Sequence, residues 1–123
     1  MKGEPIIKDA GYLSLVRRLP CIVPGCDPDL AGGEVHHPYP EGTGIKCSDF
    51  DGVPICHCHH TQGANAVDGF NQMSDDEWWA NVACMTREEA IWKTRQDVIS
   101  IVERGRLVSE EKLCRMKKRL GLA

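Results

Sequence analysis

Aromatic residues and long hydrophobic runs are both scarce in this sequence. Aromatic residues make up only 6% of the 123 residues, so a large aromatic-rich core is not expected. A chain of this length is predicted to form a single domain over residues 1–123, with a modest core. It has no run of about eighteen apolar residues, so no membrane-spanning helix is predicted. No apolar run follows Met1, so the sequence predicts no signal peptide and a cytoplasmic location.

The sequence also lacks an excess of positive charge and an even number of cysteines. The net charge of −3 argues against a protein that coats nucleic acid, but it is compatible with local basic patches. Two basic clusters occur, and each is explained equally well as a solvated helix face: Arg17 and Arg18, then Arg115, Lys117, Lys118 and Arg119. Seven cysteines without a signal peptide make a disulfide framework the weaker interpretation. Metal-bound thiolates in a reducing cytoplasm are the stronger one.

Secondary-structure signals divide the chain into three zones. Apolar residues in the first zone recur with helical spacing until Pro20, which predicts a short helix. Residues 21–77 are rich in Gly, Pro, Asp and Cys, and they are predicted to form loops and short strands. The best strand candidates are residues 34–37 and 52–56.

The third zone is predicted to be helical and to supply much of the core. Ser74 can cap a short helix around residues 77–80. Residues 86–89 (Thr-Arg-Glu-Glu) fit a capping box, and the apolar pattern behind them predicts a helix that ends near Gly105. A last helix is predicted to open at Ser109 and to stop at a glycine.

The most informative feature is the crowding of histidine and cysteine in the middle zone. All five histidines lie between residues 36 and 60, and five of the seven cysteines lie between residues 21 and 58. Two pairs with metal-ligand spacing together supply three thiolates and one imidazole, a common tetrahedral zinc set: Cys21, Cys26, Cys56 and His59. On this spacing Cys58 can replace His59, and Cys47 is a further competitor. Buried, inert cysteines are the less favoured alternative.

The histidines left over by this zinc set predict a second cation. His36 and His37 are neighbours on a predicted strand, so their side chains point to opposite faces and are expected to have different roles. His60 directly follows the proposed zinc ligand His59. A metal that fixes His59 would therefore hold His60 in one direction, where we expect it to meet His36 around a second ion.

An ordered set of short motifs between residues 12 and 80 resembles the HNH (His-Me finger) endonucleases, in particular phage-type members of the recombination-enhancement nuclease group. No single motif is diagnostic, but their order is specific. The motifs are Leu19-Pro20-Cys21, Glu34-Val35-His36-His37, Gly44-Ile45-Lys46-Cys47-Ser48-Asp49, Val53-Pro54-Ile55-Cys56 and His59-His60.

The resemblance implies an α+β fold built on a small zinc-stabilised ββα-metal core. In this family a β-hairpin carries the double histidine, and a short helix begins near the final histidine. The core would cover residues 12–80, with the cysteine pairs forming the zinc knuckle seen in many members. An N-terminal helix and C-terminal helices over residues 86–123 would flank it.

The resemblance also implies a role for individual side chains. His36 and His60 would bind the catalytic divalent ion, and His37 would be the general base. Asp49 would hold the base by a hydrogen bond, with Asp51 as a nearby alternative. Many relatives carry a further metal-binding histidine after the final pair, but no histidine follows His60 here. The ion would then depend on two histidines, water and phosphate oxygens, which suits Mg²⁺ or another divalent metal.

The implied activity is metal-dependent hydrolysis of phosphodiester bonds in DNA. Such hydrolysis needs a base for the attacking water and a cation for the charge that develops on the phosphate. A histidine with its ordinary pKa of about 6.5 is a suitable base near neutral pH. Arg17, Arg18 and Lys46 are expected to hold flanking phosphates. The expected partners are DNA and phage or host proteins of recombination or packaging, inside a bacterial cell and without a membrane.

Two other classes of function compete with this prediction. A catalytically inactive, zinc-stabilised module that binds DNA or protein is favoured by the missing third histidine and the negative net charge. A thiol redox protein using Cys56-His57-Cys58 is less favoured, because the spacing is not Cys-x-x-Cys and no βαβ pattern surrounds it. Trp78 and Trp79 could stack on bases, but packing in the core is the favoured role.

Overall fold

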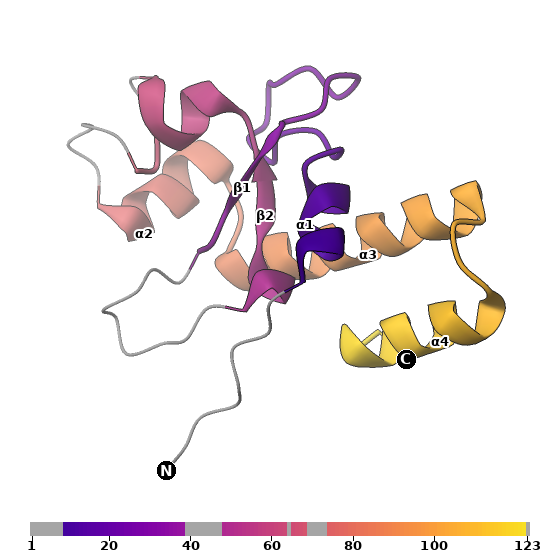
Figure 1. Cartoon of the computed structure of the whole chain (residues 1–123). Coiled ribbons are helices and arrows are strands. Elements are labelled where there is room, and N and C mark those ends of the chain that lie inside the picture. The colour runs from indigo at the N-terminus through magenta and orange to yellow at the C-terminus, as the bar shows by residue number, and fades with distance from the viewer. Residues whose placement is uncertain (1–8, 39–47, 64, 69–73, 123) are drawn as a thin grey trace, which may run out of the picture.

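The computed structural model of the protein contains a two-stranded hairpin with helices around it (Figure 1). The described residues are 9–38, 48–63, 65–68 and 74–122. In chain order the elements are α1 (Ala10–Val16), β1 (Glu34–His36), η1 (Asp49–Asp51), β2 (Val53–Ile55), η2 (Cys58–Gln62), α2 (Asp75–Trp78), η3 (Trp79–Ala83), α3 (Arg87–Gly105) and α4 (Glu110–Arg119). The predicted α+β class is therefore confirmed. No helix within these ranges is both long and apolar enough to cross a membrane.

The hairpin is short, and both its strands lie where the sequence predicted them. β1 and β2 are antiparallel, with Glu34 opposite Ile55 and His36 opposite Val53. Every residue of β2 is buried, whereas only His36 is fully buried in β1. In Figure 1, α1 and α3 lie to one side of the strands, and the segment with η2 and α2 lies to the other. β1 ends at His36, and β2 is followed by η2, so each strand ends at or next to candidate ligands.

Local side-chain chemistry sets the helix starts, as predicted. The Ser74 hydroxyl accepts the Glu77 N–H at the start of α2, and the Thr86 hydroxyl accepts the Glu89 N–H at the start of α3. Both sites are complete capping boxes, because each Glu side chain in turn accepts the cap residue's N–H. At the start of α4 the Ser109 hydroxyl accepts the Lys112 N–H, without a reciprocal bond from a Glu side chain. Each such cap stabilises its helix by about 1 kcal/mol.

The first helix ends earlier than the apolar pattern predicted. α1 stops at Val16, and the next residues form a tighter turn, in which the N–H of Leu19 donates to the Val16 carbonyl at 3.0 Å. Pro20 disfavours helical geometry in the residue before it, so the chain cannot continue as a helix to Leu19. Leu19 is nevertheless buried, at 6% exposure, because the turn directs it back into the core.

Two apolar clusters hold the elements together. One consists of Val23, Val53, Ile55, Trp78, Trp79, Ala83, Ala90 and Ile91, and the other of Tyr12, Val16, Leu19, Phe50, Val98, Ile99 and Leu120. Trp78 and Trp79 are 1% and 3% exposed, so their predicted packing role is confirmed. The C-terminal helices supply much of this core, but the middle zone contributes Val23, Phe50, Val53 and Ile55 as well. The hairpin contacts both clusters, because Val53 and Ile55 belong to the first and Val35 packs against the second.

Two candidate metal centres

Three sulfur atoms and one imidazole nitrogen converge beside the end of β2. The Sγ atoms of Cys21, Cys26 and Cys56 lie 3.8, 3.4 and 3.2 Å from Nδ1 of His59. Around a tetrahedral zinc ion, a sulfur and a nitrogen ligand lie about 3.6 Å apart, given the usual bond lengths. The four side chains therefore lie close enough to bind a metal ion such as zinc, as the sequence predicted. We call them the thiolate cluster.

The local fold explains why the two cysteine pairs meet. Cys21 and Cys26 flank a turn in which Gly25 has φ of +96°, a conformation that favours glycine. The N–H of Ile22 donates to the Pro54 carbonyl at 3.1 Å, which fastens this turn to β2 just before Cys56. Val23 between the cysteines is 6% exposed and packs into the core. The turn and the strand end are thereby held at one place.

Two thiol groups of this cluster, those of Cys21 and Cys26, have pKa values raised by burial when no cation is present. Burial, followed by the nearby Cys21, raises the pKa of Cys26 to about 12. Burial likewise raises the pKa of Cys21. A dication reverses this preference, because it binds thiolates and displaces their protons. The cluster is therefore suited to a metal rather than to free thiolate chemistry.

The structure separates the ligand alternatives that the sequence left open. Cys58 is exposed and is not part of the thiolate cluster, so His59 takes the fourth position. Of the two cysteines considered as a redox pair, Cys56 lies in the thiolate cluster and Cys58 lies outside it. Cys47, the other competitor, lies outside the described residues.

A second cluster lies on the other side of the same turn. His36 at the end of β1, His60 in η2 and Asp68 after it bring three ligand atoms within 4.8 Å of one another. Oδ2 of Asp68 lies 3.3 Å from Nδ1 of His36 and 3.2 Å from Nε2 of His60. Neighbouring ligands around one ion at about 2.1 Å are about 3.0 Å apart in an octahedron and 3.4 Å in a tetrahedron. We call this set the histidine–aspartate cluster.

Its electrostatics favour a cation at the centre. His36 is 4% exposed, and burial lowers the pKa of its imidazole, which favours the neutral form that binds metals. Its other ring nitrogen, Nε2, is buried without a hydrogen-bond partner among the described residues, and the ring centroid lies 6.4 and 6.3 Å from those of Trp78 and Trp79. The side chain of Asp68 is 51% exposed, so one side of the cluster is open to solvent.

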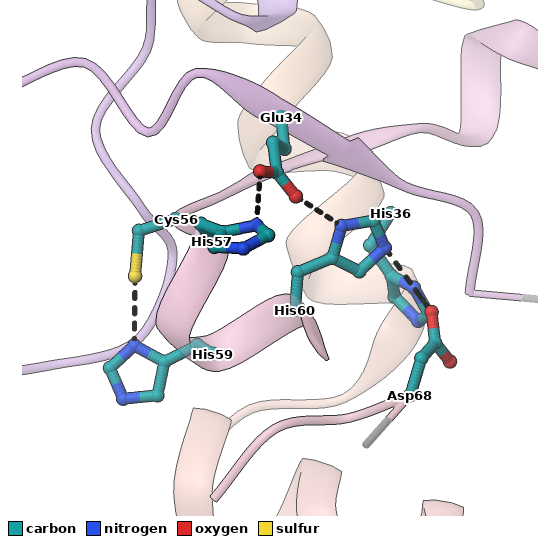
Figure 2. Close-up of polar contacts among 7 residues, drawn as sticks. All are labelled: Glu34, His36, Cys56, His57, His59, His60 and Asp68. Atoms are coloured by element: carbon teal, nitrogen blue, oxygen red, sulfur yellow. Dashed lines mark hydrogen bonds and ion pairs between the residues drawn. The ribbon is translucent and has the colours of Figure 1, made fainter. Parts of the chain in front are cut away.

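Glu34 makes two short hydrogen bonds, one to His60 of the second cluster and one to His57, which belongs to neither cluster. Its Oε1 accepts Nδ1–H of His60 at 2.7 Å, and its Oε2 accepts Nδ1–H of His57 at 2.7 Å. Figure 2 shows the carboxylate between these rings, with the ring of His59 turned toward the sulfur of Cys56. The hydrogen bond from His60, followed by that from His57, lowers the pKa of Glu34, so it is an ionised acceptor.

The remaining histidine of the double motif pairs with a buried carboxylate. Nε2 of His37 lies 3.2 Å from Oδ1 of Asp49, whose side chain is 8% exposed. Oδ2 of Asp49 accepts the backbone N–H of Asp9 at 2.7 Å, which fixes the carboxylate. Asp51, the sequence alternative, instead forms an ion pair with Arg95 at 2.9 Å. The structure thus pairs His37 with Asp49 and not with Asp51.

Two residues of the site, Asp68 and Glu34, were not predicted from the sequence. Asp68 follows His60 by eight residues in a segment without periodicity, and a lone aspartate there gives no ligand signal. Glu34 lies two residues before His36 on a predicted strand, and such residues point to the same face. This shared face is the sequence signal that could have placed Glu34 beside the metal ligands. Of the expected phosphate contacts, Arg17 and Arg18 are exposed after α1, and Lys46 lies outside the described residues.

Comparison of the chain with protein families, curated proteins and solved structures finds no match in any of the three.

Proposed function

We propose that this protein is a metal-dependent endonuclease of the HNH type, which hydrolyses phosphodiester bonds in DNA and is stabilised by zinc. The observation that carries the proposal is the histidine–aspartate cluster together with the His37–Asp49 pair. The two are adjacent through His36 and His37, which are consecutive residues. A base and an open cation site on neighbouring residues are the two components that phosphodiester hydrolysis requires. The ordered motifs of the sequence support the same assignment, including its ββα-metal core of a hairpin followed by the η2 turn.

The difference between the two clusters supports a different role for each. The thiolate cluster has four protein ligands, which is typical of a closed structural zinc site. The histidine–aspartate cluster has three, which leaves positions for water and a phosphate oxygen. Nitrogen and oxygen ligands without sulfur suit Mg²⁺ or Mn²⁺ better than the thiolate cluster does. When bound, a divalent ion there supplies positive charge to the phosphate and to the leaving 3′ oxygen.

His37 supplies the base in this proposal. An ionised Asp49 carboxylate accepts hydrogen bonds and cannot donate one. In this proposal Nε2 of His37 therefore carries the proton and Nδ1 carries the lone pair. Nδ1 takes a proton from the attacking water as its oxygen bonds to phosphorus. The bond from phosphorus to the 3′ oxygen then breaks, that oxygen takes up a proton from solvent water, and His37 returns its proton to solvent. Arg17, Arg18 and Lys46 are proposed to contact the phosphates on either side.

A plasmid-nicking assay of the zinc-loaded protein with Mg²⁺, Mn²⁺ or Ni²⁺ tests this function. We expect nicking by the wild type, and a loss of about 100- to 10,000-fold in rate in His37→Ala, since that is the usual contribution of a general base. Zinc content and binding of the second metal should stay unchanged. Gln96→Ala, an exposed site on α3, is the control and should nick normally.

Two results would contradict the proposal. One is normal nicking by His37→Ala, which would remove the proposed base. The other is a wild-type protein that binds DNA but does not cut it with any of the three metals. The second result would instead support the zinc-stabilised binding module as the function.

A further inference from the structure

Glu34 has no role in the catalytic scheme above, yet it makes two of the shortest side-chain contacts around the site. One carboxylate oxygen lies 2.7 Å from Nδ1 of His60 and the other lies 2.7 Å from Nδ1 of His57 (Figure 2). We propose that Glu34 is a positioning residue, which fixes the His60 ring in the tautomer that presents Nε2 to a divalent cation. This inference rests on the proposed second metal site.

The pleat of β1 explains how Glu34 reaches the ligand. Residues two apart on a strand point to the same face, so Glu34 and His36 both face η2. Val35 between them points the other way and packs against the cluster that contains Phe50. One strand of three residues thus delivers a metal ligand, His36, and the hydrogen-bond partner of a second ligand, His60.

Hydrogen-bond chemistry then determines which His60 nitrogen faces the ion. An ionised carboxylate accepts and cannot donate, so Nδ1 of His60 must carry the proton. A neutral ring with a proton on Nδ1 has its lone pair on Nε2, and Nε2 is the atom 3.2 Å from Oδ2 of Asp68. Without Glu34 the ring can exchange its proton to Nε2, which places a proton at the metal position. A carboxylate behind a ligating imidazole also raises the basicity of that ligand.

The bond to His57 requires a separate control. His57 lies between Cys56 and Cys58, and its side chain is 54% exposed. Loss of Glu34 could therefore disturb the metal site through His57 and the turn of the thiolate cluster, instead of through His60. His57→Ala removes the second contact of Glu34 and leaves the bond to His60 in place.

The experiment uses the zinc-loaded protein and Mn²⁺ as the probe, because Mn²⁺ prefers oxygen and nitrogen ligands over thiolates. Free Mn²⁺ is measured by electron paramagnetic resonance during titration. The tautomer of His60 is read from its imidazole ¹⁵N shifts by NMR before Mn²⁺ is added. In Glu34→Ala we expect Mn²⁺ binding to weaken by about 10- to 100-fold, the usual effect of losing such a partner. The His60 shifts should move from the Nδ1–H pattern to an exchange average.

Three further variants make the result decisive. Glu34→Gln keeps an oxygen acceptor on a side chain of similar size and should fall between the wild type and Glu34→Ala. It replaces Glu34→Ala in the test if that variant loses zinc. His57→Ala should bind Mn²⁺ as the wild type does, and so should Glu88→Ala, an exposed site on α3.

Unchanged Mn²⁺ affinity in the Glu34 variants would overturn the inference, and so would an equal loss in His57→Ala. A wild-type protein that binds no Mn²⁺ would also overturn it. A wild type that binds Mn²⁺ in a Glu34-dependent way but does not cut DNA would sustain the role of Glu34 and remove the nuclease function.

Discussion

The two clusters occupy opposite sides of one short turn, and they differ in nearly every chemical respect. His59 and His60 are consecutive, yet His59 faces three sulfur atoms, whereas His60 faces a histidine and an aspartate. The thiolate cluster is partly buried and has four protein ligands, and the histidine–aspartate cluster is open to solvent at Asp68. Adjacent residues of one turn can therefore belong to two clusters that differ in ligand chemistry and in exposure.

Backbone hydrogen bonds couple the two clusters. The N–H of Val67 donates to the His59 carbonyl at 2.8 Å, and the N–H of Asp68 donates to the His60 carbonyl at 2.9 Å. The segment that carries Asp68 is therefore fastened to the turn that the thiolate cluster holds. We expect this dependence to run in one direction: loss of zinc should release Asp68, whereas loss of Asp68 should leave the zinc in place.

The largest effect is expected from breaking the thiolate cluster. Cys56→Ser should lose zinc and the cooperative unfolding transition, because the free energy of metal binding, on the order of 10 kcal/mol for structural zinc, is free energy of folding. Binding of the second metal should disappear with it. Elemental analysis, calorimetric melting and Mn²⁺ titration measure the three quantities. A melt like that of the wild type would show that the cluster does not hold the fold.

A smaller effect, confined to one cluster, is expected from Asp68→Ala. Removing the only carboxylate that the described residues place in the histidine–aspartate cluster should weaken Mn²⁺ binding by at least about 100-fold, since even outer partners of ligands contribute 10- to 100-fold. Nicking should fall in parallel, with zinc content and melting temperature retained. Asp29→Ala, at an exposed aspartate three residues after Cys26, is the matched control. Loss of zinc in Asp68→Ala would contradict the one-way coupling.

The smallest effect is expected from Cys58→Ser. Cys58 is exposed and outside the thiolate cluster, so zinc content should stay near one ion per chain and the free energy of unfolding should change by less than about 0.5 kcal/mol. Cys26→Ser, at a cluster position, serves as the contrasting variant and should lose zinc. If Cys58→Ser lost zinc as Cys26→Ser does, the exclusion of Cys58 as a ligand would be wrong.

Much of the local structure was predictable because it depends on residues a few positions apart. The hydroxyls of Ser74, Thr86 and Ser109 meet amides three residues later, so the sequence alone predicts these caps. The spacing of Cys21 and Cys26 similarly predicts a turn that brings two sulfurs together. The position of His60 directly after His59 likewise predicted that His60 would meet His36, and the structure places both in the histidine–aspartate cluster.

Contacts that depend on the path of the chain were not predictable in the same way. The choice between Asp49 and Asp51 as the partner of His37 depends on two long-range contacts. Asp49 pairs with His37, twelve residues away, and Asp51 pairs with Arg95, forty-four residues away. Asp68 reaches His36 across thirty-two positions, from a segment that carries no pattern.

The sequence by itself determined which ligand types are available, where helices begin, and that thiolates and imidazoles gather in the middle of the chain. Only the tertiary structure decided that His59 and not Cys58 joins the thiolate cluster, that Asp68 completes the other, and that Glu34 stands behind His60. The physical reason is range. Caps and turns are settled by bonds within a few residues, whereas a metal site requires atoms from distant segments at separations of 3 to 4 Å, which only the packed hairpin, turn and helices can fix.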